Sequence, residues 1–97
     1  MFGNNNYSLE NPDSTLIRKL ISNDNLEGMN LLYDKYAALL LLVILRIVPD
    51  LERAEEILID LIDKIWKDRR ELPQSNDGFF VWLIAKTRDA VDRYFLS

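Results

Sequence analysis

Hydrophobic residues recur at three- and four-residue spacing along most of the chain, and Gly and Pro number only three each. This spacing is typical of helices that bury one face, whereas strands would show strict alternation. We therefore expect an all-α domain, a compact bundle of three to four helices. The expected helices run from Asp13 or Ser14 to residues 22–25, from Leu26 to Val48, from Leu51 to about Lys67, and from about Gly78 to Phe95. Residues 1–13 are polar and predict a flexible leader before a domain of residues 14–97.

The second expected helix contains an unbroken apolar run, Leu39–Leu45. A surface helix would keep one polar face, so the run indicates either a central helix of the bundle or a protein-binding surface. The same run could close a homodimer. From Ala37 to Val48 the apolar stretch covers about 12 residues, fewer than the ~20 that a membrane span needs, so no span is expected.

The third expected helix has two different faces. Its predicted core stripe consists of Ala54, Ile57, Leu58, Leu61 and Ile65. The opposite face is mostly acidic and consists of Glu52, Glu56, Asp60, Asp63 and Lys67, with Ile59 and Trp66 beside it. A charged face is often only solvated, but an apolar residue and an indole at its edge also fit a partner surface. Both interpretations stay open at this point.

The fourth expected helix, for which Asp77 is a candidate cap, also divides into halves. The half expected to be buried consists of Phe79, Phe80, Leu83, Ile84, Ala90, Val91 and Tyr94. The other half carries Trp82, Lys86, Asp89 and Arg93 in one narrow sector, with Arg88 further round. An indole beside cations can stack on unpaired bases while the cations meet phosphates. Alternatively, the indole packs on a neighbouring helix and the charges form ordinary ion pairs.

The amino-acid composition excludes several classes of function. Hydrophobic residues make up 48% and charged residues 29% of the 97, which is the balance of a folded globular domain rather than of a disordered chain. The chain has no Cys and no His, which excludes disulfides, Cys or His metal sites, thiol nucleophiles and Ser-His triads. We expect no catalysis, no cofactor, no metal, and a cytoplasmic protein. Carboxylate pairs such as Glu56 and Asp60 lie on an outer face and suggest no acid–base site.

Three sequence blocks together resemble region two of the extracytoplasmic-function sigma factors of bacterial RNA polymerase. The blocks are Leu32-Tyr33-Asp34-Lys35-Tyr36, the gapless thirteen residues Ala54–Trp66 preceded by Asp50, and Phe80-Val81-Trp82-Leu83. Their order and spacing fit the family over about two-thirds of the chain, from Leu31 to Asp92. The resemblance implies a helical domain that binds the β′ clamp helices of core polymerase and the non-template strand of the minus-ten promoter element.

The resemblance also implies which residues act. The expected polymerase-binding positions are Glu56, Ile59, Asp60 and Asp63, and the expected DNA-binding positions are Trp82, Lys86, Arg88 and Arg93. Both sets lie on the faces that the helical patterns single out.

The alternative is a sigma-like regulator that binds polymerase or an anti-sigma factor without recognising DNA. A net charge of -4 favours it, because nucleic acid binding then depends on a local patch. Ile59 stands where the family commonly has Gln, and Asp89 brings negative charge beside the expected strand path. No region four follows Ser97, so we expect either a fragment of a longer sigma factor or a short protein that kept the region-two fold for another task.

Overall fold

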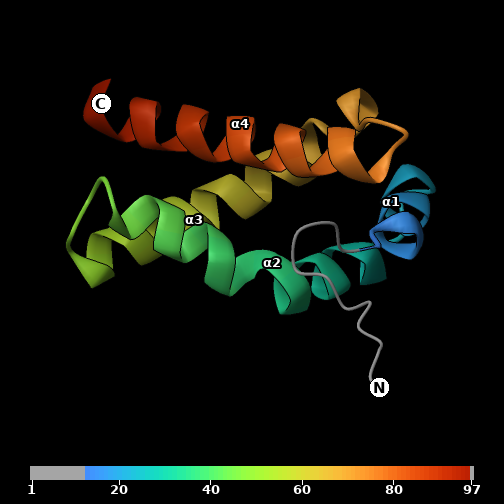
Figure 1. Ribbon diagram of the computed structural model, residues 1–97, viewed down its shortest axis with the longest axis horizontal. Coiled ribbons are helices and arrows are strands. Elements are labelled where there is room, and N and C mark those ends of the chain that lie inside the picture. The colour runs from blue at the N-terminus through green and yellow to red at the C-terminus, as the bar shows by residue number, and fades with distance from the viewer. Residues whose placement is uncertain (1–12, 97) are drawn as a thin grey trace, which may run out of the picture.

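The computed structural model describes residues 13–96, and within this range the chain folds into four α-helices and one short 3-10 turn (Figure 1). They are α1 (Thr15–Ser22), α2 (Glu27–Leu45), α3 (Leu51–Lys67), the 3-10 turn η1 (Arg69–Glu71) and α4 (Asn76–Leu96). The described part of the chain is all-α, which confirms the predicted fold class. The predicted leader lies outside the described residues except for Asp13.

Three long helices pack against one another, and α1 closes one end of the bundle by packing on α2 and η1 (Figure 1). Two ion pairs give the direction of α3 relative to α4. Asp60 pairs with Arg93 at 2.7 Å, whereas Asp68, just beyond α3, pairs with Lys86 at 2.6 Å. The later residue, Asp68, pairs with the earlier residue of α4, Lys86, and the earlier residue, Asp60, pairs with the later one, Arg93. The two helices are therefore antiparallel. In Figure 1, α2 and α4 run in the same direction.

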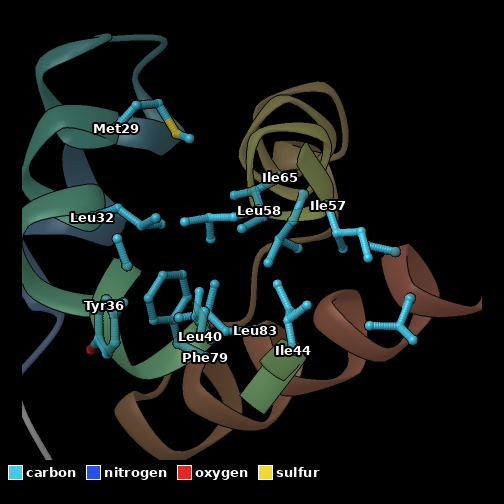
Figure 2. Close-up of a cluster of buried hydrophobic side chains, with 14 of the residues drawn as sticks. Met29, Leu32, Tyr36, Leu40, Ile44, Ile57, Leu58, Ile65, Phe79 and Leu83 are labelled. Atoms are coloured by element: carbon cyan, nitrogen blue, oxygen red, sulfur yellow. The ribbon is translucent and has the colours of Figure 1, made fainter. Parts of the chain in front are cut away.

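The core lies between α2, α3 and α4, where the labelled side chains of Figure 2 point toward one another. All five residues of the predicted α3 stripe are buried. Of the predicted buried half of α4, Phe79, Leu83, Ala90 and Val91 are buried, and Phe80, Ile84 and Tyr94 are partly buried. Thr87 is also fully buried. Its hydroxyl is satisfied there, because it donates a 2.7 Å hydrogen bond to the Leu83 carbonyl oxygen.

Helix ends differ from the prediction by a few residues. α2 ends at Leu45 rather than Val48, because the amides of Ile47 and Val48 both bond the Ile44 carbonyl and tighten the chain before Pro49. α4 begins at Asn76, two residues earlier than predicted. Its first turn is capped by the Ser75 hydroxyl, which accepts from the Gly78 amide at 3.0 Å, and the predicted cap Asp77 lies inside the helix.

The starts of α1 and α4 are joined by hydrogen bonds between buried and partly buried polar groups. The Asn76 side-chain oxygen accepts hydrogen bonds from the Ser14 amide, the Ser14 hydroxyl and Arg18, at 2.9, 2.7 and 3.0 Å. Ser14 is fully buried, and these bonds satisfy its donors. The capping carboxylate of α1 therefore comes from Asp13, which accepts from the Thr15 amide at 2.9 Å.

The apolar run of α2 is only partly enclosed. Leu40 and Ile44 are fully buried, whereas Leu39 and Leu42 remain exposed to solvent. The interpretation of α2 as a central helix therefore explains the buried side of the run, which contains Leu40 and Ile44, but not the exposed side. Among residues 13–96, α2 is the one helix long and apolar enough to cross a membrane, with a mean hydropathy of 1.5 over its best window, of which 39% is buried in the bundle. A core helix of a bundle has the same length and composition.

Candidate functional site

The outer face of α3 is the most exposed of the predicted sites. Because the core stripe of α3 occupies the opposite side, Ile59 projects from the bundle and is 70% exposed. The side chains of Glu52 and Glu56 are exposed beside it and have no ion pair within residues 13–96. This face, called the α3 outer face below, consists of Glu52, Glu56, Ile59, Asp60 and Asp63.

Two acidic residues of the α3 outer face are already paired inside the chain. The Asp63 carboxylate forms a 2.9 Å ion pair with Lys67, and this hydrogen bond raises the pKa of Lys67 above its usual value. Asp60 accepts a 2.7 Å hydrogen bond from the Arg93 guanidinium. Exposed ion pairs of this kind contribute little to stability, so a partner could displace them at small cost.

The Asp60–Arg93 pair joins the two predicted sites. Asp60 is an expected polymerase-binding residue, and Arg93 is an expected DNA-binding residue. Both line a surface hollow of about 300 Å³ between α3 and α4, whose other lining residues are Glu56, Ile57, Ala90 and Tyr94. One partner in this hollow would therefore meet residues of both sets, and the charge of Arg93 is balanced by Asp60.

Trp82 lies on the same side of α4, partly buried against the core. Its indole stacks on the Phe79 ring with centroids 6.1 Å apart and planes 29° apart. The Lys86 ammonium lies 5.4 Å from the indole centroid, within the range of a cation–π contact. The indole is thus packed down on the bundle and retains partial access to solvent.

Lys86 is held in an ion-pair cluster. Its ammonium lies 2.6 Å from Asp68 and 2.9 Å from Glu71, and only 12% of its side chain is exposed. Burial opposes the charge on Lys86, but the bonds to the two carboxylates outweigh it, so its pKa is raised. Lys64 also approaches Asp68, at 3.5 Å. A phosphate would have to compete with two carboxylates for Lys86.

Arg88 lies apart from the other expected DNA-binding residues. It lines one hollow with Ile47 and Phe95 and a second with Phe80 and Val81. Arg93 instead pairs with Asp60 of α3. Trp82 lies beside Lys86, whose carboxylate partners Asp68 and Glu71 follow α3 in the chain. The structure therefore brings together Trp82, Lys86 and Arg93 along one side of α4 and places Arg88 on another.

The turn η1 contains contacts that the sequence pattern did not predict. The Arg69 guanidinium lies 4.1 Å from the Trp66 ring centroid and 2.7 Å from an Asp24 oxygen. Arg70 reaches the same carboxylate at 3.3 Å. These bonds, chiefly the one from Arg69, lower the pKa of Asp24. Arg69 and Arg70 are adjacent in the sequence, but the acidic partner of Arg69 is 45 residues away along the chain.

The stabilisation that the ion-pair cluster of Asp68, Lys86 and Glu71 gives the fold depends on pH through the ionisation of Asp68. The hydrogen bond from Lys86 lowers the pKa of Asp68, so its ionised form stabilises the fold above the ordinary value of about 3.9. That stabilisation is lost as the pH falls through the lowered pKa. We therefore expect the difference in free energy of unfolding between the wild type and Asp68→Asn to be largest at neutral pH and to shrink below about pH 4.

Urea denaturation over a pH series measures this difference. Asp13 and Asp24 also have lowered pKa values, but they are present in both proteins and cancel in the comparison. A difference that stays constant between neutral and acid pH would contradict the assignment of this stabilisation to the ionised Asp68.

The comparisons with known proteins leave the family open. No family model, curated protein or solved structure matches the chain. Within residues 13–96, no group of three or more Asp or Glu side chains is placed to hold a metal ion. The resemblance to sigma region two therefore rests on the three sequence blocks, together with an all-α fold that is compatible with it.

Proposed function

We propose that this chain is a sigma region two-like module that acts in transcription initiation by binding core RNA polymerase through the α3 outer face. The observation that carries the proposal is the exposure of Ile59 on the same face as Glu52 and Glu56, which form no ion pair within the described residues. An exposed apolar residue on an acidic helix face suits a partner that offers an apolar contact and basic side chains. The resemblance supplies the identity of that partner, the β′ clamp helices.

A second candidate function adds contact with the minus-ten strand, and the position of Lys86 near the Trp82 ring favours it. Stacking of an extruded base on an aromatic ring contributes roughly 1–3 kcal/mol. Two features weaken this candidate: Lys86 and Arg93 are each bonded to carboxylates, and Arg88 lies on another side of α4. The protein-binding role, toward polymerase or an anti-sigma factor, needs no such rearrangement.

The polymerase proposal predicts a localised effect when a positive charge is placed on the α3 outer face. We expect Ile59→Lys to weaken binding to purified core polymerase by about tenfold or more, because the substitution removes the apolar contact and neutralises part of the acidic surface. The matched control is Leu16→Lys in α1, which changes a similarly exposed apolar residue away from α3. Fluorescence titration measures both affinities, and circular dichroism checks that both variants remain folded.

The same titration separates the two candidate functions when single-stranded non-template minus-ten DNA is added at low and moderate salt. DNA contact requires tighter, salt-sensitive binding in the presence of the strand, which Trp82→Ala should abolish in a folded protein. Polymerase binding whose affinity does not change when the strand is added would favour the alternative function, a sigma-like regulator that does not recognise DNA. If Ile59→Lys, Leu16→Lys and the wild type bound core polymerase with equal affinity, the result would contradict binding through the α3 outer face.

A further inference from the structure

A second apolar surface runs along the junction of α2 and α4. It consists of Leu39, Val43 and Ile47 from the α2 side and Phe80, Val81, Ile84 and Phe95 from α4, and is called the α2/α4 seam below. Val81 and Phe95 are 66% and 61% exposed. The two helices pack directly on each other, and Ile47 shares a surface hollow with Val91 and Phe95.

Helical spacing keeps the seam continuous. Leu39 and Val43 are four residues apart in α2, as are Phe80 and Ile84 in α4, so each pair lies along one side of its helix. Ile47 follows α2 and reaches the same junction, because it shares a hollow with Val91 and Phe95. Because α3 packs against both α2 and α4, the outer side of their junction faces away from α3. The seam is thus separate from the α3 outer face. Leu39, Ile47, Val81 and Phe95 are exposed, and the other residues of the seam are partly exposed. An apolar surface of this kind marks an interaction site.

The charges around the seam are of both signs. Arg88, Asp89 and Asp92 line the hollow that contains Ile47, and Arg46 follows α2 directly beside it. None of these four side chains has an ion pair within residues 13–96. Two cations and two carboxylates leave this rim neutral. A neutral rim gives no attraction to nucleic acid or to a strongly basic or acidic partner.

We infer that the α2/α4 seam binds a second copy of this chain in a two-fold symmetric dimer. In such a dimer each surface meets itself, so it must be complementary in charge to its own copy. The seam meets this condition, because the cations of one rim can face the carboxylates of the other. The α3 outer face does not, because its carboxylates would meet carboxylates. Dimerisation through the seam would leave the α3 outer face open to polymerase.

Sedimentation velocity of the full 97-residue chain over a concentration series tests the dimer. We expect the wild type to pass from monomer to dimer, and Val81→Glu or Ile47→Glu to weaken association about tenfold or more by placing an unpaired charge in the apolar contact. Ile59→Glu is the matched control for Val81→Glu, since the same charge enters a similarly exposed apolar position on α3 and should leave the dimer intact.

Charge exchange tests the rim separately. Arg88→Asp and Asp92→Arg should each weaken the dimer, whereas the double variant should recover most of the wild-type association, because it restores a neutral rim. A wild type that remains monomeric at every concentration would overturn the inference. So would a dimer that Ile59→Glu disrupts as strongly as Val81→Glu, or one that neither seam variant affects. Circular dichroism confirms that each variant is folded.

Discussion

Phe79→Ala is expected to lower the free energy of unfolding by about 3–5 kcal/mol, the usual cost of truncating a fully buried phenylalanine. Phe79 is the largest fully buried side chain among the described residues. Its ring meets Tyr36 of α2 edge-on at 6.0 Å and stacks on Trp82 at 6.1 Å. The substitution therefore opens a cavity at the contact between α2 and α4. A domain of this size is stable by only about 5–15 kcal/mol, so the loss is a large fraction of the total.

Urea denaturation followed by circular dichroism measures this loss, and Phe95→Ala is the matched control. Phe95 is exposed near the C-terminal end of α4, so its truncation creates no cavity and should cost less than about 1 kcal/mol. Low protein concentration keeps the comparison free of association. Equal losses in the two variants would contradict the central packing role of Phe79.

The predicted helices and core were accurate where a single periodic pattern governed the burial. In α3, the start at Leu51, the five buried residues and the end at Lys67 all agree with the structure. This is expected, because the spacing of apolar residues along an amphipathic helix already defines which side it buries. In α2 the apolar run pointed in every direction, so the sequence could not indicate that Leu40 would be buried and Leu42 exposed.

The candidate site was less predictable, because charged side chains choose partners across the fold. A helical wheel places Trp82, Lys86 and Arg93 together, and the structure agrees that they share one side of α4. A helical wheel of α4 includes only residues of α4. It therefore cannot show that Asp60, Asp68 and Glu71, which lie in or after α3, pair with Lys86 and Arg93. Pairing between residues 15 to 33 positions apart depends on how the helices dock, and helical periodicity does not contain that information.

Gly28, in the first turn of α2, shows how closely α1 and α2 approach each other. The residue is buried, and a Cβ atom added there would lie 2.7 Å from Ile21 Cγ1 and 2.9 Å from the Ile21 backbone nitrogen. Real Cβ atoms essentially never come so close to other heavy atoms. A side chain could rotate away, but a backbone nitrogen can move only if α1 shifts as a whole. The glycine is therefore required by packing rather than by an unusual backbone angle.

Gly28→Ala should consequently reverse the ordinary preference of helices for alanine. Alanine normally stabilises a helix by about 1 kcal/mol relative to glycine, but forcing apart α1 and α2 costs about 1–3 kcal/mol or more. We expect a net loss of stability in urea denaturation, with α1 losing hydrogen-exchange protection first, since it is the shortest α-helix described. The control is Ala38→Gly on the exposed side of α2, which should show the ordinary preference by destabilising the protein about 1 kcal/mol. A stabilised Gly28→Ala variant would mean that α1 can move away freely, and that its contact with α2 contributes little to the fold.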